Sequence, residues 1–256
     1  MKMYIGCQWV DREDSITVLN PFDQSIIDTV PRGTAADVET AISSAAKGAE
    51  IMAKIPSYER YMILRRTADL MAERSEDLAQ TITNEEGKVI AEGRGEVQRA
   101  IQTITLSSEE AKRLHGETVP LDGVPGNTGQ FGFTIRVPVG IVAAISPFNF
   151  PLNLVCHKVG PAIAAGNAVV LKPAGDTPLS GLKLTEIIRF PNAVHCIAWF
   201  PWILLGITLA QNNKEKSKSF FIIFFSSLMI LTAGYPYYIL YGIILFGLYY
   251  LFVSVT

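Results

Sequence analysis

Cysteine and histidine are scarce in this chain of 256 residues. Its three cysteines are widely spaced and form no Cys-x-x-Cys pair. This odd set excludes a disulfide framework, so we expect residues 1–188 to fold in a reducing, cytoplasmic compartment. The three histidines show no metal-ligand spacing, and we expect no metal site. The residues concerned are Cys7, Cys156, Cys196, His115, His157 and His195.

The chain also lacks a strong charge of either sign, with a formal net charge of -2. We therefore expect no nucleic-acid partner. Met1–Val10 contains one lysine but no long apolar run, so it does not resemble a signal peptide. Charge is missing altogether after Lys218, and 16 of the 25 aromatic residues lie within 189–256. This shift predicts one domain over residues 1–188 and a hydrophobic tail over residues 189–256.

The tail contains three apolar segments and a short basic loop at residues 212–219. Val194–Ala210 and Tyr235–Thr256 are long enough to span a membrane, whereas Phe220–Gly234 is short. One interpretation is an anchor of two or three membrane helices, whose basic loop favours the cytoplasmic side. The other is an out-of-frame or read-through translation, because the tail is rich in residues that AT-rich codons encode. The abrupt change inside a predicted helix favours the second interpretation.

The front part of the chain reads as short strands followed by helices. Apolar periodicity predicts helices that begin at the cap candidates Thr34, Ser57 and Ser75, and Gly87 and Gly116 are predicted helix ends. Turn residues separate the segments that alternate as strands do. The predicted strands are Tyr4–Trp9, Ile16–Leu19, Ser25–Val30 and Phe131–Val137.

The clearest unit is a strand–helix–strand–helix run made of Ile141–Ser146, Leu152–Ala165, Ala168–Lys172 and Leu179–Ile188. The apolar, β-branched composition of both strands suits burial on both faces. This order predicts parallel strands joined by a right-handed crossover, and therefore an α/β fold class. Without further strands the sheet would expose an edge, so we expect residues 1–188 alone to be poorly soluble or partly folded.

Two polar residues follow the strands of this unit, at the edge where open α/β sheets bind ligands. Asn149 lies just after the first strand, and Lys172 ends the second. An amide there can donate to an oxygen that gains negative charge, and a lysine suits a ribose hydroxyl or a phosphate. Each also has a simpler interpretation, Asn149 as a turn or cap residue and Lys172 as a solvated side chain. Periodicity alone leaves these alternatives open.

The exact order of residues around Asn149 and Lys172 narrows the alternatives for these two residues. The run Gly140-Ile-Val-Ala-Ala-Ile-Ser-Pro-Phe-Asn149-Phe-Pro151, continued to Leu171-Lys172-Pro-Ala174, strongly resembles the aldehyde dehydrogenase superfamily. The resemblance covers roughly residues 3–188 and implies an incomplete Rossmann-like cofactor-binding domain. Apolar segments that we expect to be helical follow it. The front part agrees through Gly6-x-x-Trp9-Val10, Asn20-Pro21, Glu86-Gly87-Lys88 and Ala111–Glu117.

The resemblance implies NAD- or NADP-dependent oxidation of a small aldehyde to a carboxylic acid. In that family a cysteine thiolate attacks the aldehyde to give a thiohemiacetal, hydride passes to the cofactor, and water cleaves the thioester. Asn149 matches the asparagine that stabilises the oxyanion, and Lys172 matches the lysine at the adenosine ribose. Gly175 stands where NAD-preferring members often have glutamate, which favours acceptance of NADP. The other matching cofactor positions are Ile145, Ser146, Pro147 and Phe148, beside the nicotinamide ribose, and Ala174.

The family's nucleophile is missing from this sequence. Cys196 lacks the Gly-Gln-x-Cys setting and lies too close in sequence to Asn149, while Cys156 reads as a small buried hydrophobe. We therefore expect a truncated chain with half the cofactor site and no turnover of its own. The alternative is a membrane-tethered nucleotide-binding or scaffold module without catalytic activity.

Two further expectations concern partners and surface. The Pro-Phe-Asn-Phe-Pro variant is similar to members that act on small hydroxy- or phospho-aldehydes. Complete members are homo-oligomers, although a missing carboxyl half would remove pairing surfaces. The acidic pairs Glu85-Glu86 and Glu109-Glu110 are interpreted as solvated helix faces.

Overall fold

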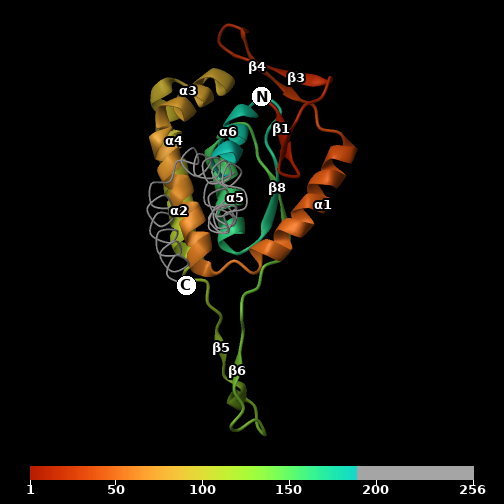
Figure 1. Cartoon of the computed structure of the whole chain (residues 1–256). Helices are drawn as coiled ribbons and strands as arrows, with labels where there is room; N and C mark the ends of the chain where they lie inside the picture. Colours follow the sequence, from red (N-terminus) through yellow and green to blue (C-terminus); the bar gives the residue numbers. More distant parts are fainter. Residues whose placement is uncertain (189–256) are drawn as a thin grey trace, which may run out of the picture. The chain divides into compact units, whose positions relative to one another are not determined.

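The computed structural model describes residues 1–188. Two antiparallel hairpins precede a set of helices, and a parallel strand pair alternates with the last two helices (Figure 1). The strands are β1 (Met3–Ile5), β2 (Gln8–Val10), β3 (Ser15–Leu19), β4 (Ile26–Pro31), β5 (Thr118–Val119), β6 (Gly132–Phe133), β7 (Ile141–Ile145) and β8 (Ala168–Lys172). The helices are α1 (Ala35–Met52), α2 (Ser57–Glu73), α3 (Ser75–Glu86), α4 (Ile90–Ala111), the short 3-10 helix η1 (Leu121–Gly123), α5 (Asn153–Ala164) and α6 (Leu179–Ile188).

The predicted boundary near residue 188 coincides with the end of the described residues. The predicted membrane segments at 194–256 lie outside them. Within residues 1–188, no helix combines the length and apolar character needed to cross a membrane. The domain division therefore stays a prediction.

The first predicted strand, Tyr4–Trp9, is in fact a hairpin. β1 and β2 pair antiparallel with Tyr4 opposite Trp9. Gly6 and Cys7 form the turn, with φ angles of 59° and 64°. A non-glycine residue at such a φ is uncommon, so a turn at Cys7 could not be expected from its residue type. The next two predicted strands are confirmed as β3 and β4, which pair antiparallel.

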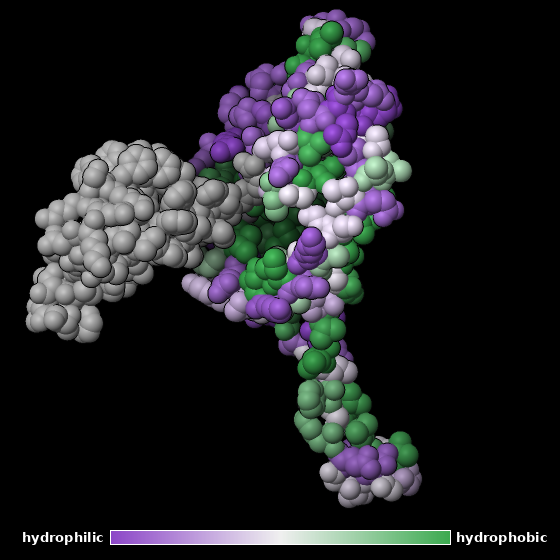
Figure 2. Space-filling view, turned by 45° about the vertical axis from the view of Figure 1, so that its right-hand side comes forward, coloured by the Kyte–Doolittle hydropathy of each residue, from purple (hydrophilic) through white to green (hydrophobic). Residues whose placement is uncertain are grey.

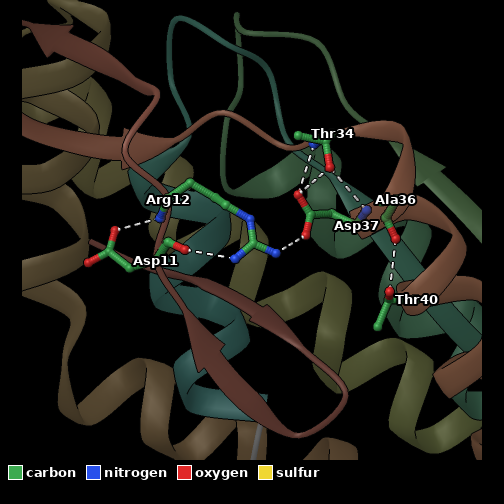
Figure 3. Close-up of polar contacts among 6 residues, drawn as sticks. All are labelled: Asp11, Arg12, Thr34, Ala36, Asp37 and Thr40. Carbon is green, nitrogen blue, oxygen red and sulfur yellow. Dashed lines mark hydrogen bonds and ion pairs between the residues drawn. The ribbon is translucent and has the colours of Figure 1, made fainter.

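Thr34 caps α1, as predicted. Its Oγ1 accepts a hydrogen bond from the backbone N–H of Asp37, whose carboxylate in turn accepts from the backbone N–H of Thr34 at 2.9 Å. Arg12, in the loop between β2 and β3, donates to the same carboxylate at 2.5 Å (Figure 3). The Arg12 guanidinium and the bonds from Thr34 hold the pKa of Asp37 down at about 2. The Arg12–Asp37 contact therefore links the loop between the two amino-terminal hairpins to the first turn of α1.

The other predicted helix limits are only partly correct. Ser57 and Ser75 are the first residues inside α2 and α3, and neither helix has a side-chain cap. Gly87 ends α3 with a φ of 82°, as predicted. α4 ends at Ala111, before the predicted stop at Gly116. Gly116 has a different role, because a Cβ there would lie 1.6 Å from the backbone oxygen of Thr134.

The main core lies where α2, α3, α4 and α5 pack against one another. Helix α4 is central to it, since it contacts each of the other three. Burial of apolar side chains away from water is the main contribution to the stability of this region. The largest fully buried apolar side chains here are Leu64, Met71, Leu78, Ile82, Val97, Ile104, Leu152 and Val155.

The predicted βαβα unit is confirmed. β7 and β8 pair in parallel, from Ile141 opposite Ala168 to Ile145 opposite Lys172. Helices α1 and α5 both pack against β8. The turn before β8 uses Gly166 at a φ of 84°, and the side chain of Asn167 accepts from the backbone N–H of Gly140 at 2.9 Å. The two strands therefore start and end level with each other.

Burial of β7 on both faces was predicted and is wrong for the described residues. Ala144 is fully buried, but Ile141 and Ile145 remain 38% and 64% exposed. The physical reason is that the described sheet contains only β7 and β8, so no further strand within residues 1–188 covers the free edge of β7 and the side chains beside it. Exposure of these apolar side chains agrees with the predicted solubility problem, which itself stays untested.

Residues 116–139 form an arm that extends away from the helices (Figure 1). Its strands β5 and β6 pair over two residues each, so the predicted strand Phe131–Val137 is reduced to Gly132–Phe133. Apolar residues gather along the arm in Figure 2. Those with large exposed side chains are Val119, Val124, Phe131, Phe133, Ile135, Val137 and Val139.

Candidate functional site

The two strand ends that carry the predicted site residues lie side by side. Ile145 pairs with Lys172, and the backbone N–H of Ser146 donates to the Lys172 carbonyl at 3.2 Å. The sequence prediction that one ligand could reach both strand ends is therefore geometrically sound. The roles of the individual side chains remain predictions.

The segment after β7 is open to solvent. Ile145 and Phe148 are 64% and 56% exposed, and Pro147 and Asn149 are also exposed. Ser146 is the exception, because it is buried and its Oγ has no hydrogen-bond partner within the described part of the chain. An unpaired buried hydroxyl is costly unless some group comes to meet it, so a ligand hydroxyl is a reasonable partner.

The end of β8 and the loop after it provide a positive charge at Lys172 and open space at Gly175. Lys172 is exposed at the strand end, and Ala174 is buried below the loop. Gly175 is exposed, and a Cβ added there would meet nothing within 4 Å. A ribose hydroxyl or an additional phosphate can therefore approach Gly175 without a steric clash, which fits a dinucleotide at this edge.

A buried glutamate binds the N-terminus of each helix that follows these strands. Glu96, from α4, accepts from the backbone N–H groups of Leu152 and Asn153 at 3.0 and 3.1 Å. Glu85, from α3, accepts from Leu179 at 2.7 Å and from Ser180 at 2.9 Å. Helix N-termini commonly bind cofactor phosphates, but these donors are already used by the protein. These two helix N-termini therefore have fewer free N–H donors for a phosphate.

The interpretation of Glu85-Glu86 as a solvated face is wrong. Glu85 is 3% exposed, and burial raises its pKa to about 7 although the bonds from Ser180 and Leu179 oppose the rise. Burial also raises the pKa of Glu86, against the effect of Lys88. Glu85 is buried because it contacts Leu179 and Ser180, a segment far along the chain that no local pattern indicates. The other pair, Glu109-Glu110, does form exposed ion pairs with Lys112 and Arg113.

Lys88 is a site residue that sequence reasoning missed. Its Nζ lies 2.8 Å from Glu96 Oε2, 2.9 Å from Glu86 Oε2 and 2.7 Å from the backbone carbonyl oxygen of Asn149. It also lies 3.8 Å from the centre of the Phe150 ring. The Glu86-Gly87-Lys88 motif was visible in the sequence, but nothing in it indicated contact with a segment 61 residues away.

Of the two cysteines in the described residues, Cys156 is a poor nucleophile. Cys156 is fully buried, as predicted, and burial together with the negative charge of Glu96 raises the pKa of its thiol. Cys7 is exposed, but it lies in the turn between β1 and β2. Cys196 lies outside the described residues. Residues 1–188 also contain no group of three His, Cys, Asp or Glu side chains that could hold a metal ion.

Comparison with known proteins identifies the family. The model of the aldehyde dehydrogenase family matches residues 9–196. A 3-sulfolactaldehyde dehydrogenase from Priestia aryabhattai is 47% identical over 187 residues, which is 73% of this chain and 39% of that protein. Some other curated relatives align over 85% of the chain, so the likeness continues past Ile188, the limit predicted from the sequence.

Solved structures agree on the fold. Aldehyde dehydrogenase 21 from Physcomitrella patens, in complex with succinate, has a TM-score of 0.71 and 42% identity, over 73% of this chain and 39% of that one. An NADP-dependent glyceraldehyde-3-phosphate dehydrogenase from Bacillus halodurans, complexed with NADP, has a TM-score of 0.69 and 34% identity, over 73% and 40%. The chain thus spans about two fifths of the length of these relatives. With its parallel strand pair and the motifs at both strand ends, the chain belongs to the aldehyde dehydrogenase family.

Proposed function

We propose that this chain contributes the cofactor and oxyanion half of an NAD- or NADP-dependent aldehyde dehydrogenase. The single observation that carries the proposal is the pairing of Ile145 with Lys172, which brings the two motif-bearing strand ends to one edge. The bound cofactor would supply the hydride acceptor. Ile145–Phe148 would line the nicotinamide ribose, and Lys172 with Ala174 and Gly175 would contact the adenosine ribose.

Asn149 is proposed as the oxyanion donor. Its side-chain amide would donate a hydrogen bond to the aldehyde oxygen as that oxygen gains negative charge. One such donor typically lowers the barrier by roughly 3–4 kcal/mol. The exposed position of Asn149 after β7 leaves its side chain accessible to a substrate on the sheet edge.

The proposed cofactor preference includes NADP. Gly175 has open space around the position of a Cβ, so a 2′-phosphate can be accommodated, and residue 175 itself contributes no carboxylate. The test is titration of NADPH and NADH into the wild-type chain and a Gly175→Glu variant. We expect the glutamate to abolish NADPH binding and to retain NADH binding. Equal loss of both cofactors would contradict the proposed position of the adenosine ribose.

The proposed substrate of the complete enzyme is a small aldehyde with a polar substituent. Support comes from the motif around Asn149 and from a relative named 3-sulfolactaldehyde dehydrogenase. The chain by itself is proposed not to turn aldehydes over, because Cys156 is buried and Cys196 lacks the Gly-Gln-x-Cys setting. Aldehyde-dependent formation of NADPH by the purified chain would overturn this.

The tail has two competing explanations, a membrane anchor and an out-of-frame translation. We favour the second, with the change of frame beyond Ile188, because the likeness to relatives continues past that residue. The discriminating observation is the DNA beyond codon 188, read in the other two frames. A Gly-Gln-x-Cys sequence in either frame would support the frameshift, and its absence would favour a non-catalytic, membrane-tethered module. Membrane fractionation of the expressed chain tests the anchor directly.

A further inference from the structure

We infer that Lys88 is a positioning residue for Asn149, which rests on the function proposed above for that amide. Asn149 lies in the exposed connection between β7 and α5 and belongs to neither element. An amide that must meet a developing oxyanion needs a fixed main chain, because small misplacements are costly in rate. The structure supplies that fixation from a helix pair remote in sequence.

Two groups hold this connection, one at its middle and one at its end. At its middle, Lys88 Nζ donates to the Asn149 carbonyl oxygen at 2.7 Å. At its end, Glu96 accepts from the backbone N–H groups of Leu152 and Asn153. Lys88 and Glu96 are themselves joined at 2.8 Å. The connection is therefore held by one linked ion pair and not by two independent contacts.

Lys88 donates two hydrogen bonds, to Glu96 and to the Asn149 carbonyl oxygen, and forms a further ion pair with Glu86. An ammonium group carries three N–H donors. Three oxygens surround its Nζ within 2.9 Å, from Glu86, Glu96 and Asn149. Its side chain is only 16% exposed, so water competes little for these donors. A mostly buried ammonium group that forms two charge-assisted hydrogen bonds and a further ion pair holds its partners in a fixed geometry.

The aromatic residue next to Asn149 is held by the same group. Lys88 Nζ lies 3.8 Å from the Phe150 ring centre, and the Arg99 guanidinium carbon lies 4.8 Å from it. Contacts of this kind add attraction between a cation and the ring face. The backbone of Asn149 and the side chain of Phe150 are thus fixed together, on both sides of one peptide bond.

The contact can be observed directly, because Asn-Phe occurs only once in the sequence, at Asn149-Phe150. A full-length chain labelled with carbonyl-¹³C asparagine and ¹⁵N phenylalanine therefore gives one carbonyl–amide cross-peak in an HNCO spectrum. Its carbonyl shift reports the bond from Lys88, and relaxation of its amide reports the mobility of the connection. A merely structural role in helix packing would leave the carbonyl shift in place.

In Lys88→Met we expect the carbonyl resonance to move upfield. We also expect the order parameter of the amide to fall from about 0.85 to below about 0.6. Lys88→Arg should restore most of the shift. Lys183→Met is the matched control, because Lys183 also forms an ion pair on this domain, with Asp77 at 2.6 Å, and should leave the peak unchanged. An unmoved peak in Lys88→Met, or an equal movement in Lys183→Met, overturns the inference.

Lys88→Met leaves Glu96 buried without its cation, which can prevent folding. The double variant Lys88→Met/Glu96→Gln removes both charges and keeps an acceptor for Leu152, and it should give the same upfield shift. NADPH titration of the wild-type chain is run in parallel. Absence of NADPH binding with a shifted peak would refute the proposed function alone, whereas NADPH binding with an unshifted peak would refute the role of Lys88 alone.

Discussion

Glu85 accepts a hydrogen bond at 2.7 Å from the backbone N–H of Leu179, a residue 94 positions later in the chain. The bond joins α3 to the first turn of α6, which follows the strand that carries Lys172. Glu96 makes the equivalent connection from α4 to α5, which follows the strand that precedes Asn149. Each of the two strand–helix connections at the proposed site is therefore fixed by a buried carboxylate from the helical layer.

The first prediction concerns the pH dependence of stability. Burial raises the pKa of Glu85 from 4.5 to about 7, so the folded state binds this proton more tightly than the unfolded chain. The contribution is fully present below about pH 4.5 and is lost as the pH rises through about 7. It corresponds to roughly 3 kcal/mol. We expect the free energy of unfolding in urea to fall between pH 4.5 and 8 by up to this amount more in wild type than in Glu85→Gln.

Glu109→Gln is the control for that experiment, because Glu109 lies in an exposed pair with Lys112 and should change stability little. Identical pH profiles for Glu85→Gln and wild type would show that Glu85 does not exchange its proton in this window.

The second prediction concerns the network around Asp37. Its pKa is held at about 2 chiefly by Arg12, so the associated stability is present above pH 3.8 and is lost as the pH falls towards 2. Arg12→Met should raise the Asp37 pKa and make thermal stability less sensitive to pH in that range. Arg32→Met is the matched control, because Arg32 pairs with the exposed Asp14 at 3.2 Å and its loss should change the acid dependence little. A steeper acid dependence in Arg12→Met would argue against this assignment.

The third prediction compares two glycines in α4. A Cβ at Gly93 would lie 2.9 Å from the backbone oxygen of Ala79 in α3, whereas a Cβ at Gly95 would meet nothing within 4 Å. Gly93→Ala should therefore destabilise the fold by roughly 1–3 kcal/mol. Gly95→Ala should stabilise it by up to about 1 kcal/mol, because alanine has the higher helix propensity. Denaturant unfolding measures both, and equal effects would show that α3 and α4 are not packed this closely.

Local signals in the sequence predicted several local features of the fold correctly. Thr34 caps α1, Gly87 ends α3, and the apolar strands β7 and β8 pair in parallel. These features depend on a few adjacent residues, and on the fixed handedness of strand crossovers. The strand-end position of Asn149 and Lys172 follows from the same local pattern.

Long-range contacts decided the features that the sequence did not predict. The buried position of Glu85 depends on Leu179 and Ser180, and that of Lys88 depends on Asn149 and Glu96. A charged residue in an amphipathic helix is usually solvated, so a local reading favours exposure. Only the packing of α3 and α4 beside α5 and α6 brings these charges to backbone donors and acceptors that need them.

The most direct test of the proposed site is NADPH binding to the full chain with and without Lys172. Fluorescence titration should show that Lys172→Met weakens NADPH binding by at least about tenfold, as expected for loss of a charge-assisted hydrogen bond. Lys183→Met, which removes a lysine from α6, should bind NADPH as wild type does. Equal affinities for Lys172→Met and wild type would contradict a cofactor site at the ends of β7 and β8.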